Sequence, residues 1–123
     1  VVISGDGAFL SGGLSIEAAF QENVPITVVI DNNGGLTTIS QQQERLFADE
    51  QHVATDFRDI PFHTMFEGMG GHGELVEKPE DLQPALERAL SSGRTACVNV
   101  RTRSAISPIV LATTSKRDKA SIE

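Results

Sequence analysis

Two short runs of apolar, mostly β-branched residues, each ending in a polar cluster, constrain the fold of this chain most strongly. The first run, Val1–Ser4, ends at Gly5-Asp6-Gly7, and the second, Pro25–Ile30, ends at Asp31-Asn32-Asn33. Such runs are typical of buried strands. The residues between them, from about 13 to 22, have helical character. A strand–helix–strand unit with parallel strands is therefore predicted.

The rest of the chain continues the alternation of helix and strand. Helices are predicted near residues 40–47, at 60–69 and from Pro79 to Gly93, and short strands at 74–76 and 96–100. The polar stretch 36–58 has few core residues, so we expect it at the surface or over a site. This order of elements predicts an α/β fold with a mostly parallel sheet.

Two predictions concern the core. Leu82, Leu86 and Leu90 recur at four-residue spacing and form the expected apolar stripe of the helix that Pro79 begins. Cys97 alternates with apolar neighbours in the last strand and is expected to be packed there. As the only cysteine, it also excludes an intramolecular disulfide.

Composition excludes several classes of protein. The 123 residues carry 10 Lys and Arg against 17 Asp and Glu, and the formal net charge of -7 argues against a nucleic-acid partner. No apolar run reaches the roughly 18 residues of a membrane span, and no export leader is recognisable, so a cytoplasmic location is expected. The chain opens at Val1, inside a predicted strand, which leads us to expect a longer protein.

Charge divides the chain into two parts. Residues 1–99 hold 5 basic and 15 acidic side chains, whereas residues 100–123 hold 5 basic and 2 acidic ones. The charges mark a basic C-terminal segment from Arg101 through Lys119. We expect a domain over residues 1–110 and a basic tail over 111–123, which includes Lys116, Arg117 and Lys119. A solvated terminus is the first interpretation of this tail; contact with an anionic ligand or an acidic subunit is the alternative.

The two polar clusters fall where parallel sheets bind ligands, outside the carboxyl ends of strands. If the two strands are neighbours, Asp6 and Asn33 converge there with hard oxygen ligands that suit Mg²⁺. Gly7 and Ala8 would present main-chain N–H groups to phosphate with little side-chain bulk. These groups favour a metal-bridged diphosphate site. As plain strand-ending turns, the same clusters would need no ligand.

The pairing of these clusters resembles the signature of thiamine-diphosphate-dependent enzymes. In this chain 24 residues separate Gly5-Asp6-Gly7 from Asn32-Asn33. Ala8-Phe9 after the first cluster and Asn23-Val24-Pro25 before the second strand match the family as well.

The resemblance extends to about Val110, and the later residues indicate one group within the thiamine-diphosphate-dependent enzymes. Residues 69–76, the helix start at 79–82 and the strand at 96–100 look like the C-terminal part of the acetolactate-synthase-like group. The resemblance implies the thiamine-diphosphate-binding fold, a three-layer sandwich with helices on both faces of a mostly parallel sheet.

The resemblance also implies roles for individual residues. Asp6 and Asn33 would bind Mg²⁺ by their side chains, and Gly35 would bind it by its main-chain carbonyl. Gly5, Gly7 and Ala8, together with these three, match the positions that surround the cofactor diphosphate. Gly34-Gly35 replaces bulkier residues of the family, but a carbonyl ligand needs no particular side chain.

Other parts of the implied active site lie outside these residues. In the family, the glutamate that contacts the aminopyrimidine ring lies on an N-terminal domain, usually of the partner subunit, and the cofactor-bending residue precedes the Gly-Asp-Gly. A homodimer or homotetramer with shared sites is therefore expected, and this chain should not turn over substrate alone. FAD could bind only through upstream domains. No catalytic residue is assigned.

The histidines and glutamines allow further alternatives. His52 and Gln41, Gln42 and Gln43 lie in the polar stretch that corresponds to family segments ordering over the cofactor, so a substrate contact is one interpretation and a solvated lid the other. His63 lies in the same region. A catalytic role for His72 is the weaker hypothesis, because the family varies at that position.

The resemblance leads to one main functional hypothesis and its alternatives. We expect an enzyme of acetolactate-synthase type, a lyase or transferase that uses Mg²⁺ and thiamine diphosphate to act on a 2-oxo acid through an enamine. A 2-hydroxyacyl-CoA lyase or an oxalyl-CoA-decarboxylase-like enzyme is the alternative within the family. A non-catalytic module for diphosphate binding or subunit assembly is the alternative outside it.

Overall fold

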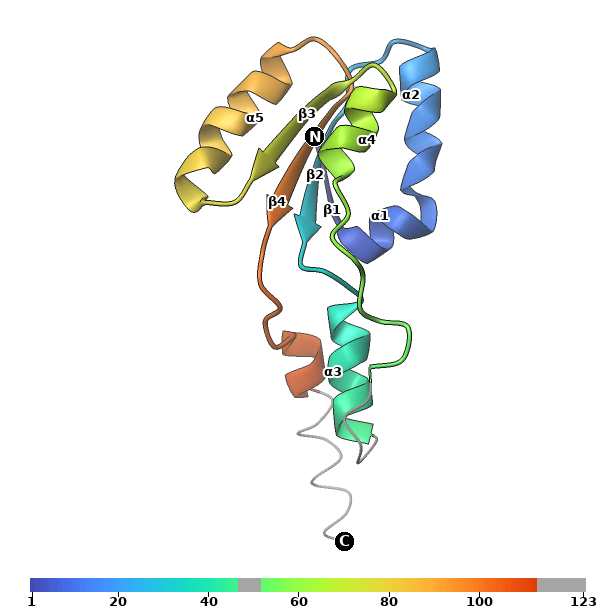
Figure 1. Cartoon of the computed structure of the whole chain (residues 1–123), viewed down its shortest axis with the longest axis vertical. Coiled ribbons are helices and arrows are strands. Elements are labelled where there is room, and N and C mark those ends of the chain that lie inside the picture. Colours follow the sequence, from blue (N-terminus) through green and yellow to red (C-terminus); the bar gives the residue numbers. More distant parts are fainter. Residues whose placement is uncertain (47–51, 113–123) are drawn as a thin grey trace, which may run out of the picture.

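A computed structural model of the chain describes residues 1–46 and 52–112. Within these described residues, four strands form one sheet, all parallel, in the order β1-β2-β4-β3 (Figure 1). The strands are β1 (Val2–Gly5), β2 (Thr27–Asn32), β3 (His72–Val76) and β4 (Ala96–Arg101). The predicted parallel α/β architecture is confirmed.

Helices lie on both faces of this sheet (Figure 1). One face carries α1 (Asp6–Gly12), α2 (Glu17–Gln21) and α4 (Phe62–Gly68), and the other carries α5 (Leu82–Ser91). Short 3₁₀ turns, Gly13–Ile16 and Pro79–Asp81, precede α2 and α5. The remaining helix, α3 (Thr37–Leu46), extends beyond the carboxyl ends of the strands beside a helical segment at 108–112 (Figure 1).

Alternation along β2 and β4 separates two apolar cores. Val28, Ile30 and Cys97 pack with phenylalanines of the helices on one face, where the rings of Phe9 and Phe62 meet edge to face at 5.6 Å. Val98 packs on the opposite face against alanines of α5. Cys97 is fully buried, as predicted, and burial raises the pKa of its thiol to about 12.

Three local predictions were wrong. The helical region begins earlier than the predicted stretch at about 13–22, because α1 begins directly at Asp6. Val1–Ser4 is not a buried strand: β1 is an edge strand, and Ile3 is 78% exposed because α5 covers β3 and β4 instead. Leu90 is 57% exposed, since Ala85 and Ala89 form the buried centre of the α5 face.

Two further sequence predictions concern the basic tail and the membrane span. Residues 113–123, with Lys116, Arg117 and Lys119 of the predicted basic tail, lie outside the described residues. Within the described residues, no helix combines the length and the apolar character needed to cross a membrane.

Candidate functional site

The six residues predicted to bind cofactor come together around one cavity at the carboxyl ends of β1 and β2. These strands are neighbours, with Gly5 opposite Asp31 in their register. The cavity has a volume of about 280 Å³, and its lining includes Gly5, Asp6, Gly7, Ala8, Asn33 and Gly35. The N-terminal turn of α3 lines its remaining side. Residues from both predicted clusters therefore converge on one point.

Asp6 holds the two sides of this cavity together. Its Oδ2 accepts hydrogen bonds from the main-chain N–H groups of Gly34 at 2.8 Å and Gly35 at 3.0 Å. Its Oδ1 accepts one from Gly7 at 2.7 Å, so a phosphate here must compete with Asp6 for that N–H group. Asp6 is only 2% exposed, and no cationic side chain of the described residues pairs with it.

The loop after β2 approaches another segment so closely that glycine is required. A Cβ atom on Gly35 would lie 2.3 Å from the carbonyl oxygen of Thr55. Gly34 has a φ of +85°, which favours glycine. The Gly34 carbonyl accepts a hydrogen bond from Phe57 at 2.8 Å, whereas Gly35 meets Asp56 in an antiparallel bridge. Sequence analysis missed this pairing, since it joins residues more than 20 positions apart without a local signal.

The two asparagines of the Asn-Asn pair have different surroundings. Asn32 Nδ2 donates to the carbonyl of Ile60 at 3.2 Å and to Asn99 Oδ1 at 3.1 Å, and Asn99 meets His63 Nδ1 at 3.2 Å. Asn33 instead lines the cavity, where its Oδ1 accepts a hydrogen bond from Thr37 at 2.8 Å. Asn32 and His63 therefore stabilise the structure behind the site, and Asn33 faces the site.

This donor set fits a small, hard cation. Buried carboxylates are normally paired with a cation or bind a metal, and described side chains supply no cation for Asp6. Nor do described residues offer any group of three His, Cys, Asp or Glu side chains placed to hold a metal. A metal would therefore need the Asn33 amide and the Gly35 carbonyl as well as Asp6. Oxygen ligands of this kind suit Mg²⁺, with phosphate and water completing the shell.

Comparison with known proteins agrees with this geometry. Residues 1–100 match the family described as "Thiamine pyrophosphate enzyme, C-terminal TPP binding domain", where thiamine pyrophosphate is another name for thiamine diphosphate. The chain belongs to this family. Its relation to the acetolactate-synthase-like group, suggested by the motifs, is confirmed by its relatives.

Several curated proteins are similar to this thiamine diphosphate domain. The acetolactate synthase large subunit of Mycobacterium tuberculosis is 39% identical over 103 residues, which cover 83% of this chain and 18% of that protein. A 2-hydroxyacyl-CoA lyase of Oryza sativa is 28% identical over 110 residues, which cover 81% of this chain and 18% of the lyase. The acetolactate synthase isozyme 2 large subunit of Escherichia coli is 29% identical over 93 residues, which cover 75% of this chain and 17% of that subunit. The chain thus spans less than a fifth of the length of these relatives.

Side chains of α3 in the thiamine diphosphate domain hold neighbouring segments in place. Gln41 donates to the carbonyl of Ala105 at 2.7 Å and accepts from the N–H group of Ser107 at 3.0 Å. Gln43 forms a similar pair of bonds with the main chain of Val53, at 3.2 and 2.9 Å. The amides of both residues, expected as candidate substrate contacts, are thus engaged by main chain. Gln42 is exposed.

His52 lies beside the cavity and between two carboxylates. Its Nε2 is 2.6 Å from Glu44 Oε1, and its Nδ1 is 3.2 Å from Asp56. These hydrogen bonds, Glu44 first, raise the pKa of His52. Together these three residues line a smaller cavity of about 120 Å³, which shares Asn33 and Gly35 with the first. The structure therefore keeps His52 near the candidate site.

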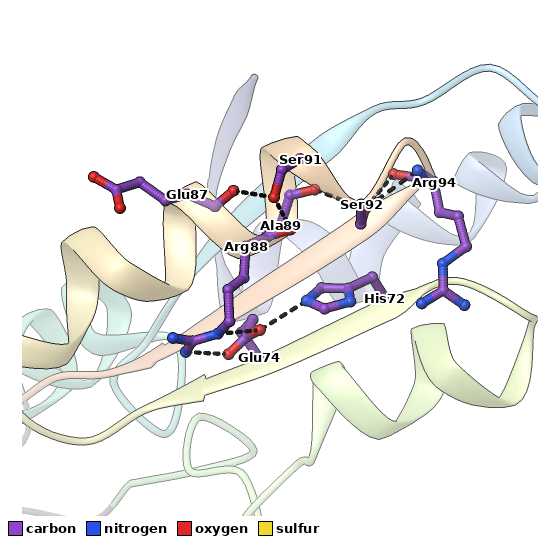
Figure 2. Close-up of polar contacts among 8 residues, drawn as sticks. All are labelled: His72, Glu74, Glu87, Arg88, Ala89, Ser91, Ser92 and Arg94. Atoms are coloured by element: carbon purple, nitrogen blue, oxygen red, sulfur yellow. Dashed lines mark hydrogen bonds and ion pairs between the residues drawn. The ribbon is translucent and has the colours of Figure 1, made fainter.

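His72 lies at the opposite end of the sheet. It is the first residue of β3 and pairs with Ala96 at the start of β4, whereas the candidate site follows the strand ends. Figure 2 shows His72 and Arg88 approaching the carboxylate of Glu74, at 2.7 Å for His72 Nε2 and at 2.9 and 2.7 Å for Arg88. Hydrogen bonds from Arg88, and secondly from His72, lower the pKa of Glu74. His72 thus belongs to a structural ion-pair cluster far from the site.

Proposed function

We propose that this domain anchors the diphosphate of thiamine diphosphate through Mg²⁺ in an enzyme that acts on 2-oxo acids. The observation that carries this proposal is the buried carboxylate of Asp6, without a cationic partner among described side chains, at one cavity with Asn33 and Gly35. Asp6 and Asn33 would hold the metal by side-chain oxygens and Gly35 by its carbonyl. Ala8 would direct its main-chain N–H group to phosphate.

The residues of this chain bind and orient the cofactor. When bound, thiamine diphosphate supplies a carbon nucleophile that adds to the substrate carbonyl and stabilises the resulting carbanion. Asp6 would offset part of the charge of the metal ion, and the closely packed Gly35 keeps its carbonyl in a fixed place. His52, in the adjoining cavity, is the nearest candidate for a substrate contact. The remaining groups would come from other segments of a cytoplasmic homodimer or homotetramer, so this domain alone would be inactive.

The experiment is an activity assay of the full-length protein with thiamine diphosphate and Mg²⁺. Pyruvate and other 2-oxo acids are supplied separately, and carbon dioxide and the condensation product are measured. Release of carbon dioxide with an acetolactate-type product is expected. Asp6→Ala should abolish turnover, whereas Glu74→Gln, on β3 at the opposite edge of the sheet, should not.

A second candidate, cleavage of a 2-hydroxyacyl-CoA, is favoured by the 28% identity to the rice lyase. The same protein preparation is therefore tested with a 2-hydroxyacyl-CoA, and acyl-CoA loss and aldehyde formation are measured. If aldehyde forms and no 2-oxo acid is turned over, cleavage of a 2-hydroxyacyl-CoA becomes the proposed reaction in place of the first one. Binding of the cofactor without either reaction would instead favour a non-catalytic module.

A further inference from the structure

Thr37 occupies a distinctive place beside the candidate metal ligands. It is the first residue of α3, four positions after Asn33 and two after Gly35. Its hydroxyl donates a hydrogen bond of 2.8 Å to Asn33 Oδ1. The Thr37 hydroxyl oxygen also lies 3.5 Å from the carbonyl oxygen of Gly35. One side chain thus contacts both oxygens that the proposed function assigns to the metal besides those of Asp6.

The Asn33 side chain needs such support more than the rest of this loop. Two successive glycines, Gly34 and Gly35, follow Asn33, and glycine leaves the main chain more freedom than any other residue. Asp6 restrains the N–H groups of both glycines, and Phe57 restrains the carbonyl of Gly34. None of these bonds fixes the side chain of Asn33. The Thr37 hydroxyl is the group bonded to its amide oxygen.

We propose that Thr37 is a positioning residue that holds Asn33 Oδ1 ready for the metal ion. This inference rests on the proposed function. A carbonyl oxygen has two lone pairs, so Asn33 Oδ1 can accept the hydroxyl proton of Thr37 and still bind a cation. Partners that orient metal ligands in this way typically change metal affinity by about 10- to 100-fold when removed.

The test measures metal binding rather than turnover. Mn²⁺ replaces Mg²⁺ in the full-length protein with saturating thiamine diphosphate, and electron paramagnetic resonance gives the dissociation constant. Thr37→Val removes the hydroxyl at nearly constant shape and should weaken Mn²⁺ binding about 10-fold. Thr37→Ser keeps a hydroxyl and should bind within about twofold of the wild type. Thr64→Val, at an exposed position of α4, is the matched control and should bind as the wild type does.

The outcomes separate this inference from the function on which it rests. Unchanged affinity in Thr37→Val would overturn the positioning role. An Asn33→Ala variant is measured as well. If Thr37→Val loses Mn²⁺ binding as completely as Asn33→Ala does, the positioning role is also overturned, because the Thr37 hydroxyl would then be a metal ligand itself. If Thr37→Val fails to fold, as judged by circular dichroism, Thr37→Ala is compared with Thr37→Ser in its place. A wild-type protein that binds no Mn²⁺ with thiamine diphosphate would contradict the proposed function instead.

Discussion

Two poorly exposed carboxylates lie at opposite edges of the sheet and have opposite surroundings. Glu74, with 12% of its side chain exposed, faces Arg88 and His72 in the middle of the edge strand β3 (Figure 2). Asp6, 2% exposed at the carboxyl end, receives three main-chain N–H groups and no cationic side chain from the described residues. The charge of Glu74 is thus balanced within the domain, whereas that of Asp6 is solvated only by dipoles.

This difference distinguishes a structural carboxylate from a binding one. A carboxylate already paired with Arg88 has little to gain from an added cation, because the pair satisfies both charges. A buried carboxylate without such a partner gains strongly from one. The contrast therefore supports the proposed cation site at Asp6, and the predictions below test it from the largest expected effect to the smallest.

Asp6→Ala should have the largest effect. It removes the charged oxygen ligand, so the affinity of the full-length protein for Mg²⁺ with thiamine diphosphate should fall by more than about 100-fold, beyond the loss typical of outer-shell partners. Isothermal titration calorimetry measures this affinity. Asp31→Ala is the matched control, since Asp31 is exposed at the end of the neighbouring strand, bonded to Thr102, and should bind normally. Equal losses in both variants would contradict the special role of Asp6.

Gly35→Ala should have an intermediate effect, on stability. The added Cβ would lie 2.3 Å from the Thr55 carbonyl, and main chain cannot move aside as a flexible side chain can. We expect a loss of about 2 kcal/mol in the free energy of unfolding, measured by urea denaturation. Gly5→Ala is the control: its Cβ meets nothing within 4 Å and its φ of -71° suits alanine, so little change is expected. A Gly35→Ala variant as stable as Gly5→Ala would disprove the close packing of this loop.

Glu74→Gln should have the smallest effect and leave cofactor binding unchanged. It weakens the bonds to Arg88, whose side chain is 56% exposed, so solvent screening limits the loss to about 1 kcal/mol near neutral pH. Because Arg88 first, and His72 second, lower the pKa of Glu74 in the folded state, its contribution is present above the ordinary value of 4.5 and is lost as the pH falls below it. The melting temperatures of wild type and variant, measured from neutral pH down to about pH 3, should therefore converge in acid. A constant difference at every pH would refute the ion-pair account.

Much of the fold was predictable from the sequence. β2 and β4 were predicted within one or two residues because continuous β-branched runs identify interior strands of a parallel sheet. The start of α1 at Asp6 was missed, because Gly7 and Gly12 are weak helix formers and the helix depends on packing of Phe9 instead. Local sequence also gave no sign that Ile3 lies exposed on an edge strand.

The candidate site was predictable in its residues but not in its contacts. The polar strand ends predicted Asp6 and Asn33, and the family resemblance implied Gly35; all three line the cavity. The motif could not show that Thr55 packs on Gly35, since that contact depends on the path of the chain between them. The bond from Thr37 to Asn33 depends likewise on α3 beginning at that residue. The path of the chain between segments and the exact start of α3, rather than motif spacing, therefore fix the detailed geometry.

The most direct test of the cation site is a calorimetric titration of the full-length protein with thiamine diphosphate, once with Mg²⁺ and once with EDTA. If Asp6 requires an added cation to hold the diphosphate, binding occurs with Mg²⁺ and disappears with EDTA. Equal affinity in both titrations would contradict this account, because the diphosphate would then bind without a metal beside Asp6.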